Sequence, residues 1–203
     1  MVAIIDYGAG NLQSVRKALD FLGCDSEITM DKEKIESASH VILPGVGSFG
    51  DAMASIRERG LEDIIKKSAD GSKPFLGICL GLQLLFEESE ESPGVAGLGI
   101  FKGKIVKIPK DNGLKVPHMG WNSVSLKQND GIFRGIKDNS YFYFVHSYYL
   151  PDAEKDVTAG TTHYGVEITC AVQNGLVSAA QFHPEKSSDA GLQLLKNFTA
   201  LEG

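Results

Sequence analysis

The chain has 203 residues, of which 42% are hydrophobic and 23% charged, and its formal net charge is -6. This length suits one domain over residues 1–203, because a chain of this size buries roughly 70% of its unfolded surface without help from disulfides. The negative charge, with no basic cluster to offset it, argues against a nucleic-acid-binding surface. The start of the chain has neither a basic segment nor a long apolar run, so we expect no membrane insertion and no export. The odd count of three cysteines fits a reducing cytoplasm.

The chain from residue 1 to about 90 alternates apolar strands with amphipathic helices. This alternation predicts right-handed crossovers and a parallel sheet flanked by helices. The expected strands are 2–6, 26–29, 40–43 and 74–78, and the expected helices are 11–22, 50–59, 61–69 and 80–89.

The pattern changes from about residue 98, where short strands are joined by Gly, Asn and Asp turns, which favours antiparallel pairing. The expected fold is therefore α/β, an open mixed and mainly parallel sheet with an antiparallel second half, with ligands at the carboxyl ends of its strands. The acidic run 87–92 is interpreted as a solvated helix end. The expected elements are strands 103–108, 121–126, 140–150, 166–172 and 176–182, and a closing helix over 190–198.

Cys79 lies between an expected strand and an expected helix, in the sequence Gly77-Ile78-Cys79-Leu80-Gly81. Glycines two residues before and after it remove the Cβ atoms that would crowd a sharp turn, as in the nucleophile elbow of serine hydrolases. The thiol would point outward at a helix N-terminus, where unpaired N–H groups favour the nucleophilic thiolate. A buried, inert cysteine is the alternative, but it would need no sharp turn.

His183 is the candidate base for this cysteine, because a free thiol is only slightly ionised near neutral pH. It closes the expected strand 176–182 and is followed by Pro184 and Glu185. In extended chain, residues two apart face the same side, so Glu185 would accept one ring N–H and hold the other nitrogen toward the thiol. Taken alone, His-Pro-Glu is equally compatible with a plain strand terminus, but the cysteine upstream favours a Cys-His-Glu triad.

A glycine-rich loop follows the apolar strand at 41–43, in the sequence Pro44-Gly45-Val46-Gly47-Ser48. Acyl transfer through a thioester builds negative charge on a carbonyl oxygen, which backbone N–H groups can stabilise. Val46 or Gly47, together with Leu80, would supply those groups as an oxyanion hole. The alternative is a loop whose glycines serve turns only, and the spacing matches no phosphate-binding fingerprint.

Three motifs together resemble the triad-type glutamine amidotransferases: Gly-Ile-Cys-Leu-Gly-Leu-Gln at 77–83, Gln-Phe-His-Pro-Glu at 181–185 and Pro-Gly-Val-Gly-Ser-Phe at 44–49. The resemblance implies hydrolysis of glutamine to glutamate and ammonia through a cysteinyl thioester, without a cofactor. Cys79 would be the nucleophile, His183 the proton carrier and Glu185 its partner. The positions that would hold the amino-acid end of glutamine are Gly47, Gln83, Ser147 and Tyr148.

Within that family, three further segments resemble the glutaminase subunits of imidazole glycerol phosphate synthase, from histidine biosynthesis. They are Pro-His-Met-Gly-Trp-Asn at 117–122, Tyr-Phe-Val-His-Ser-Tyr at 143–148 and Lys-Ser-Ser at 186–188. The resemblance implies a heterodimer with a (β/α)8 cyclase, which uses the ammonia to make imidazole glycerol phosphate and an aminoimidazole carboxamide ribotide. The positions at the cyclase face or the ammonia route would be Asn11, Met119, Trp121, Asn122, Tyr143 and Lys186.

Two other functions stay open on the sequence. Another triad amidotransferase or a γ-glutamyl hydrolase would share 77–83 and 181–185 but would have no reason for the segment 117–122. A catalytically silent interaction subunit would have no need of a filled triad. We expect no metal site, because the remaining histidines and cysteines lack close ligand spacing and are interpreted as core or loop residues: His40, His118, His146, His163, Cys24 and Cys170.

Overall fold

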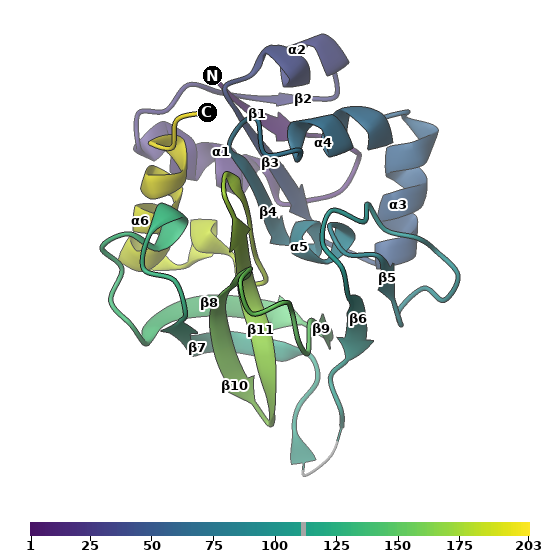
Figure 1. The fold of residues 1–203 in the computed structure, drawn as a ribbon, viewed down its shortest axis with the longest axis vertical. Helices are drawn as coiled ribbons and strands as arrows, with labels where there is room; N and C mark the ends of the chain where they lie inside the picture. The colour runs from purple at the N-terminus through teal and green to yellow at the C-terminus, as the bar shows by residue number, and fades with distance from the viewer. Residues whose placement is uncertain (111–112) are drawn as a thin grey trace.

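A nine-stranded sheet forms the centre of the molecule, in the order β2-β1-β3-β4-β12-β11-β10-β7-β8 (Figure 1). The computed structural model describes residues 1–110 and 113–203. From β2 to β12 every pairing is parallel, as the alternation of strands and helices predicts. The bounds of these strands are Val2–Ile5 for β1, Ser26–Thr29 for β2, His40–Gly45 for β3, Phe75–Cys79 for β4 and Val177–Ala180 for β12.

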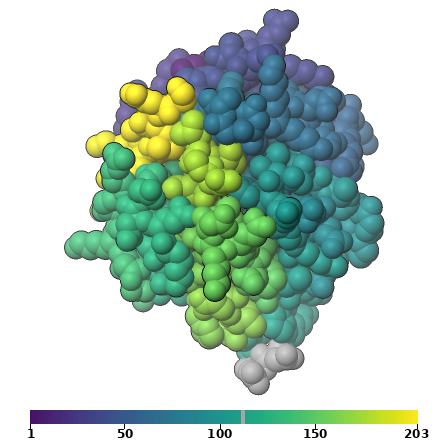
Figure 2. Space-filling model, in the orientation of Figure 1, coloured from purple at the N-terminus to yellow at the C-terminus, as the bar shows by residue number. Residues whose placement is uncertain are grey.

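The other side of the sheet is antiparallel, and β12 joins the two sides by pairing with β4 on one edge and with β11 on the other. A small three-stranded sheet, β5-β6-β9, lies beside it. In Figure 2 the N-terminal half forms the upper surface of the molecule, and the residues of β10 and β11 project below it in green. The bounds are His118–Leu126 for β7, Ser140–His146 for β8, Thr158–Tyr164 for β10, Val166–Asn174 for β11, Glu88–Ser89 for β5, Lys104–Lys107 for β6 and Tyr148–Tyr149 for β9.

Helices cover both faces of the parallel strands, because those strands bury side chains on alternating sides. Leu43 of β3 packs in the cluster that contains helices α3 and α4, whereas Ile42 packs in the cluster that contains α1 and α6. The α/β fold expected from the sequence is thus confirmed. The helices are α1 Leu12–Phe21, α2 Lys32–Ser37, α3 Phe49–Glu58, α4 Glu62–Ser68, α5 Leu80–Leu84 and α6 Ser188–Thr199, with 3-10 turns η2 Gly131–Phe133 and η3 Pro184–Lys186.

The helix expected over 80–89 is much shorter than predicted. α5 ends at Leu84, and the N–H groups of Leu85 and Phe86 bond to carbonyls three residues back, which tightens the chain into a turn. The carbonyl of Phe86 then lies against Gly97, where a Cβ atom would come within 2.1 Å of it. The chain therefore leaves the helix after one turn and enters β5.

The acidic run 87–92 is not a helix end, because α5 ends at Leu84, although Glu87, Glu88 and Glu90 are exposed as the sequence suggested. Its side chains accept hydrogen bonds from the main chain of neighbouring segments. Glu91 Oε2 accepts from Phe49 N at 2.8 Å, at the start of α3, and Glu90 Oε2 accepts from Lys107 N at 3.0 Å. A carboxylate at a helix start satisfies an N–H group that has no partner within the helix. The run therefore fixes α3 and β6 to the segment after α5.

Other elements differ from the prediction for identifiable reasons. The strand expected over 140–150 divides at Ser147, where the chain passes from the large sheet into the small one. β10 was not predicted, because its sequence is rich in Gly, Thr and Ala, yet pairing with both β7 and β11 buries its centre. Helix α2 was also missed, because it is short and buries only Ile35. Asp31 caps its start, with a side chain that accepts from two main-chain N–H groups.

The carboxyl ends of β3, β4 and β12 lie next to one another, because these strands are parallel neighbours in register. Gly45 pairs with Cys79 at this edge, and His183 follows β12 by three residues. Among the described residues, no helix is both long and apolar enough to cross a membrane. In the same part of the chain, no group of three or more His, Cys, Asp or Glu side chains is arranged to hold a metal ion.

Candidate active site

Cys79 occupies a sharp turn between β4 and α5, with φ +56, a conformation that non-glycine residues rarely adopt. The neighbouring glycines allow the turn to pack. A Cβ atom on Gly81 would come within 1.9 Å of the carbonyl oxygen of Leu43, and one on Gly77 within 2.9 Å of the carbonyl oxygen of Gly81. The sulfur lines a cleft of about 380 Å³ although only 7% of the residue is exposed. The strained turn therefore delivers a thiol into a cleft, as strain at functional sites commonly does.

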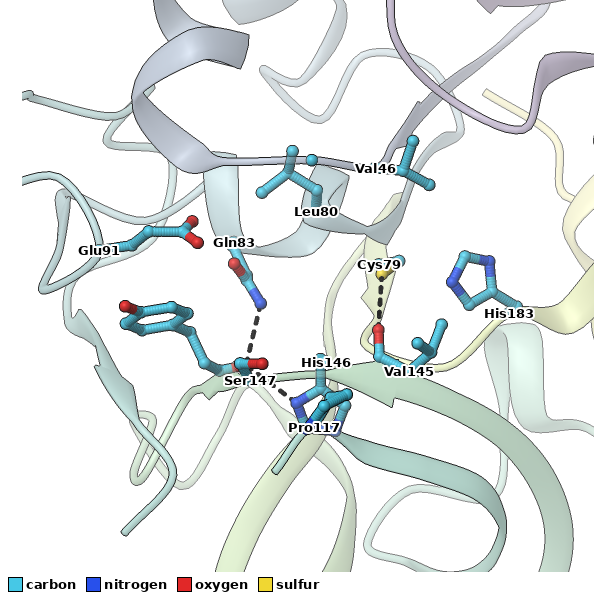
Figure 3. Close-up of a pocket in the computed structure, with 12 residues that line it drawn as sticks. Val46, Cys79, Leu80, Gln83, Glu91, Pro117, Val145, His146, Ser147 and His183 are labelled. Carbon is cyan, nitrogen blue, oxygen red and sulfur yellow. Dashed lines mark hydrogen bonds between the residues drawn. The ribbon is translucent and has the colours of Figure 1, made fainter. Parts of the chain in front are cut away.

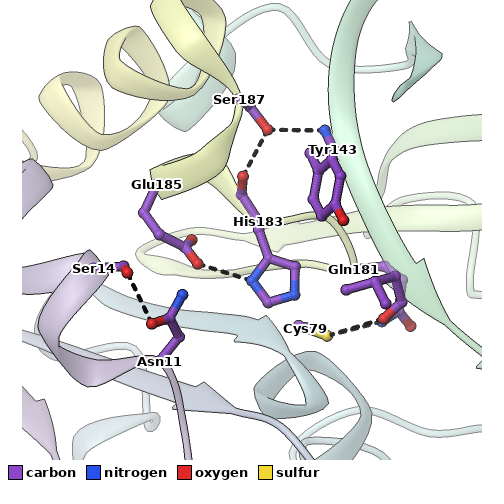
Figure 4. Close-up of polar contacts among 9 residues, drawn as sticks. Asn11, Ser14, Cys79, Tyr143, Gln181, His183, Glu185 and Ser187 are labelled. Atoms are coloured by element: carbon purple, nitrogen blue, oxygen red, sulfur yellow. Dashed lines mark hydrogen bonds and ion pairs between the residues drawn. The ribbon is translucent and has the colours of Figure 1, made fainter. Parts of the chain in front are cut away.

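His183 lines the same cleft and is anchored by its main chain. Its N–H donates to the carbonyl of Tyr143 at 2.9 Å, and its own carbonyl accepts from Ser187 Oγ at 2.6 Å (Figure 4). The ring Nδ1 and Glu185 Oε1 are 2.8 Å apart, with both side chains almost fully buried. The extended geometry expected for residues 183–185 is wrong, because Pro184 begins the 3-10 turn η3. That turn nonetheless places Glu185 beside the ring.

The other ring nitrogen of His183 is on the cleft side. Nε2 is buried and has no hydrogen-bond partner, and the ring lies beside Cys79 in Figures 3 and 4. Burial alone lowers the pKa of His183, but the charges of Cys79 and Glu185 outweigh it and raise that pKa well above the ordinary value of 6.5. Nε2 makes no direct hydrogen bond to the sulfur, so the higher pKa comes from the hydrogen bond between Nδ1 and Glu185 and from the adjacent charges. The ring of His183 is therefore protonated near neutral pH.

The loop after β3 also lines the cleft, and Figure 3 shows Val46 on the same side of it as Cys79 and His183. Val46 and Gly47 are on its rim and Leu80 is directly after the nucleophile, and all three line the cleft with Cys79. Gly47 has φ +99, which suits glycine and strains other residues. Val46 is 42% exposed, which is high for an aliphatic side chain next to a buried strand. The loop and the sulfur therefore border the same cleft.

The far wall of the cleft contains Gln83, Ser147 and Tyr148. Gln83 is buried on α5, and its side-chain Nε2 donates to the carbonyl of Tyr148 at 3.0 Å and to Gln181 Oε1 at 2.9 Å (Figure 3). Ser147 is the residue at which the chain passes from β8 to β9. These residues come together only because α5 packs against the crossing between the two sheets.

Comparison with known proteins decides the family. The model of the family described as "Glutamine amidotransferase class-I" matches residues 3–201. This chain belongs to that family. It is 53% identical over 200 residues to the "Imidazole glycerol phosphate synthase subunit HisH" of Moorella thermoacetica, covering 98% of this chain and 94% of that relative. It is 50% identical over 205 residues to "Imidazole glycerol phosphate synthase subunit HisH 1" of Methanococcus maripaludis, covering 99% of this chain and 100% of that relative.

The fold of this amidotransferase is shared with proteins of much lower sequence similarity. The "Structure of PurLQS from Thermotoga maritima" aligns with a TM-score of 0.76 at 20% identity, over 98% of this chain and 96% of that one. At 20% identity, this similarity shows a shared fold and nothing about function. The prediction that the chain is a triad-type glutamine amidotransferase is confirmed by the family match, and the prediction of an α/β fold by the structure.

Two buried histidines of the amidotransferase form a chain that the sequence reasoning interpreted as plain core. His146 Nδ1 is 2.9 Å from the carbonyl of Tyr148, so this nitrogen carries the hydrogen and Nε2 accepts. His118 Nδ1 lies 3.0 Å from His146 Nε2 and must therefore donate to it. His118 Nε2 in turn accepts from Asn122 Nδ2 at 3.3 Å. Burial lowers the pKa of His118 to about 4 and that of His146 to about 3, so both rings are neutral near pH 7.

The residues expected at the partner face are divided between surfaces. Met119 and Trp121 point to one side of β7 and are 62% and 51% exposed. Trp121 pairs with Tyr143 of β8 in edge-to-face contact, with ring centroids 6.3 Å apart. Lys186 Nζ lies 5.8 Å from the centre of the Tyr143 ring. These four residues form one exposed group, which we call the aromatic face.

Asn122 and Asn11 do not join the aromatic face. Asn122 alternates to the other side of β7 and donates to the carbonyl of His163 as well as to His118. Asn11 precedes helix α1 and accepts from Ser14 Oγ at 2.8 Å. In Figure 4 Asn11 and Ser14 are seen below Glu185, to the left of the His183 ring. Both amides therefore have partners within the chain itself.

Sequence reasoning missed four residues that line the cleft, Glu91, Pro117, Val145 and His146, and also Gln181 beside it. Gln181 contacts the sulfur of Cys79. Gln181 is two residues before His183, a spacing that places both side chains on one side of an extended chain and was therefore a usable signal. Glu91 and His146 gave no such signal, because their positions depend on the turn after α5 and on the pairing of β7 with β8.

Proposed function

We propose that this chain is the glutaminase subunit of an imidazole glycerol phosphate synthase. It hydrolyses glutamine through a thioester on Cys79 and delivers ammonia to a (β/α)8 cyclase subunit that makes imidazole glycerol phosphate and an aminoimidazole carboxamide ribotide. The observation that carries the proposal is the strained, cleft-lining Cys79 beside a His183 whose ring is held by Glu185 at 2.8 Å. Relatives that carry this subunit's name at about half identity over the full chain support the choice of pathway.

The first half of the reaction forms the thioester. The sulfur of Cys79 attacks the side-chain carbonyl of glutamine, and the electron pair of the C=O bond moves to oxygen. The N–H groups of Val46 or Gly47 and of Leu80 stabilise this oxyanion. Because His183 is protonated at rest, it gives its proton to the nitrogen as the C–N bond breaks, and ammonia leaves. Glu185 keeps the ring in place and stabilises its charge.

The second half hydrolyses the thioester. Neutral His183 takes a proton from water, the hydroxide adds to the thioester carbonyl, and the C–S bond breaks with its electron pair on sulfur. Glutamate leaves, and the thiolate and imidazolium are restored. Gly47, Gln83, Ser147 and Tyr148 hold the amino-acid end of glutamine along the cleft wall in this proposal, which fits their position opposite His183.

The aromatic face is proposed as part of the cyclase contact. Exposed aromatic residues and a lysine over a ring form the kind of surface that protein partners bury. Ammonia released into water at neutral pH mostly becomes ammonium and loses its nucleophilicity, so transfer inside a complex protects it. We also propose that residues 1–203 act as one domain in a reducing cytoplasm. β12 joining both halves of the sheet and three unpaired cysteines support this.

The test is glutamine hydrolysis by the chain alone, with a cyclase, and with the cyclase carrying its substrate-site ligand. We expect low activity alone and strong stimulation by the liganded cyclase, because uncoupled hydrolysis wastes glutamine. The loop at Val46, between two glycines, gives the site a segment with two low-cost arrangements. Full activity of the free chain, unchanged by the cyclase, would contradict the proposal and favour a free-standing glutaminase or γ-glutamyl hydrolase.

A further inference from the structure

Gln181 contacts the sulfur of Cys79 from the side opposite the open cleft. Its side-chain Nε2 is 3.8 Å from Cys79 Sγ, within the range of an N–H···S hydrogen bond, and the residue is fully buried (Figure 4). The other close polar neighbour is the carbonyl of Val145, with its oxygen 3.9 Å from the sulfur. A thiol can point its hydrogen at that carbonyl, but a thiolate is repelled by it. The charged sulfur therefore needs donors on its other sides.

The direction of the Gln181 amide is fixed by the main chain. The carbonyl of Tyr148 is an acceptor only, so the atom of Gln83 that faces it must be the amide nitrogen. The second hydrogen of that nitrogen points to Gln181 and requires an acceptor, which is Gln181 Oε1. The remaining end of the Gln181 amide, which faces the sulfur, is then the NH2 group. The carbonyl of Tyr148 thus fixes the orientation of the Gln83 amide, which in turn makes Gln181 a donor to the sulfur.

The main chain around Gln181 is held on both sides. Its N–H donates to the carbonyl of Cys170 at 2.8 Å, just past the end of β12, and His183 two residues later is anchored to Tyr143. The same short segment therefore positions the base and the amide. Donors held in place before a reaction stabilise developing charge without a cost of reorganisation.

We propose that Gln181 donates a hydrogen bond to the thiolate of Cys79 and is a further catalytic residue of the proposed glutaminase. This inference rests on the proposed function. The bond acts twice in the reaction. It raises the fraction of Cys79 present as thiolate before attack, and it stabilises the electron pair that returns to sulfur when the thioester C–S bond breaks.

Gln83 takes on a second role in this arrangement. Its amide borders the proposed glutamine site and orients Gln181. Two hydrogen bonds therefore connect Gln83 to the nucleophile, one from Gln83 to Gln181 and one from Gln181 to the sulfur of Cys79. A substitution at Gln83 is therefore expected to change the reactivity of Cys79 even when no glutamine is present.

The experiment measures how fast iodoacetamide alkylates Cys79 in the free chain as a function of pH, read by mass spectrometry of the Cys79 peptide. Gln181→Met keeps the side-chain volume and removes the donor. Gln181→Glu keeps an acceptor for Gln83 and places a negative charge near the sulfur. We expect the pH of half-maximal alkylation to rise by about one unit in Gln181→Met, an effect of about tenfold at lower pH, and further in Gln181→Glu.

The matched control is Gln173→Met. Gln173 is also a buried glutamine, but it lies on β11 opposite Ser178, toward the other end of β12, and bonds to Gln128 and to the N–H of Ile132. Its substitution should leave the pH profile of Cys79 unchanged. The titratable groups that surround the sulfur remain in every variant: His183 and Glu185 after β12, His146 at the end of β8 and Tyr7 after β1.

The outcomes separate the two proposals. A purely structural role for Gln181 would change the maximal alkylation rate or the melting temperature and leave the midpoint pH in place, which would overturn the inference. If Gln181→Met does not fold, the midpoint in Gln181→Leu decides in the same way, because that variant also removes the donor without adding a charge. Failure of glutamine to protect wild-type Cys79 from alkylation would count against the proposed function, whichever midpoint Gln181 gives.

Discussion

The parallel and antiparallel halves of this sheet contribute to the active site in different ways. In the parallel half, each functional group lies at or just after the end of its own strand: Cys79 is the last residue of β4 and Val46 follows β3. In the antiparallel half, the cleft wall depends on cross-strand pairs, such as His118 opposite His146. Catalytic residues at strand ends can be predicted from short sequence motifs. Residues of the cleft wall are brought together by cross-strand pairing, so their positions depend on the register of the strands. The parallel half should therefore control turnover, and the antiparallel half should control binding, orientation and docking.

The largest expected effect is the loss of the nucleophile in the parallel half. Cys79→Ala should abolish glutamine-dependent synthesis by the complex and leave synthesis from added ammonium salt unchanged, because the cyclase needs only free ammonia. Assays of product formation with each nitrogen source check this. Cys170→Ala, which removes a buried thiol outside the cleft, is the matched control and should retain both activities. Normal glutamine turnover in Cys79→Ala would remove this residue from the mechanism.

The two partners of the cysteine should differ in the size of their effects. His183→Asn removes the proton carrier and should lower kcat by about 10³-fold or more. Glu185→Gln keeps the shape and can still accept a bond from the ring, so its loss should be smaller. Steady-state kinetics of the stimulated complex measure both. Small and equal losses in the two variants would rule out the triad assignment.

The histidine pair makes the antiparallel half sensitive to acid. The unfolded chain binds protons at both imidazoles below about pH 6.5, whereas folding lowers the pKa of His118 to about 4 and that of His146 to about 3. Because the unfolded state binds more protons in this window, the free energy of unfolding should fall as pH drops from 6.5 toward 4. For the enclosed His146 the loss at pH 5 is about 2 kcal/mol.

Urea denaturation at pH 5, 6 and 7 measures that slope. His118→Phe removes one of the two imidazoles at a site where the ring already stacks on Phe144 and Tyr164, so the variant should show a shallower slope. His163→Phe removes an exposed imidazole on β10 and serves as the control, with the slope of the wild type. A slope in His118→Phe equal to that of the wild type would show that the pair does not titrate on unfolding.

The smallest expected effect concerns the point where the two halves meet. Lys186 belongs to the turn after β12, yet it lies over the ring of Tyr143 on β8. Lys186→Glu should weaken binding of the cyclase, or the stimulation it causes, by about tenfold, and a compensating basic residue on the cyclase should restore part of it. Titration of the cyclase at physiological salt measures this, with Lys196→Glu on α6 as the control. Wild-type binding and stimulation in Lys186→Glu would leave Lys186 as a solvated surface lysine.

Much of the parallel half could be predicted from sequence because its signals are local. The β4 turn is marked by Gly77 and Gly81, and the structure shows why, since a side chain at either position would collide with the main chain. The end of α5 could not be predicted in the same way. The residues after Leu84 continue an apolar helical pattern, but the carbonyls of Leu84 and Leu85 accept hydrogen bonds from Leu98 and Ile100, and the carbonyl of Phe86 lies against Gly97.

The antiparallel half was less predictable because its determinants are distant in sequence. His118 and His146 are 28 residues apart and become a hydrogen-bonded pair only through the register of β7 and β8. Asn122 was grouped with Trp121 by motif, but the alternation of side chains along β7 separates them onto opposite faces. β10 was missed because burial of its small and polar residues comes from having strands on both sides.

In the proposed complex, the ammonia released at Cys79 reaches the cyclase without entering the solvent. This transfer is tested most directly by giving the complex glutamine labelled with 15N at its amide, in a large excess of unlabelled ammonium salt at neutral pH, and measuring the label in imidazole glycerol phosphate by mass spectrometry. We predict nearly full 15N incorporation in the wild-type complex and none when the glutaminase carries Cys79→Ala. Label diluted to the ratio of the two nitrogen sources in the wild-type complex would contradict that prediction.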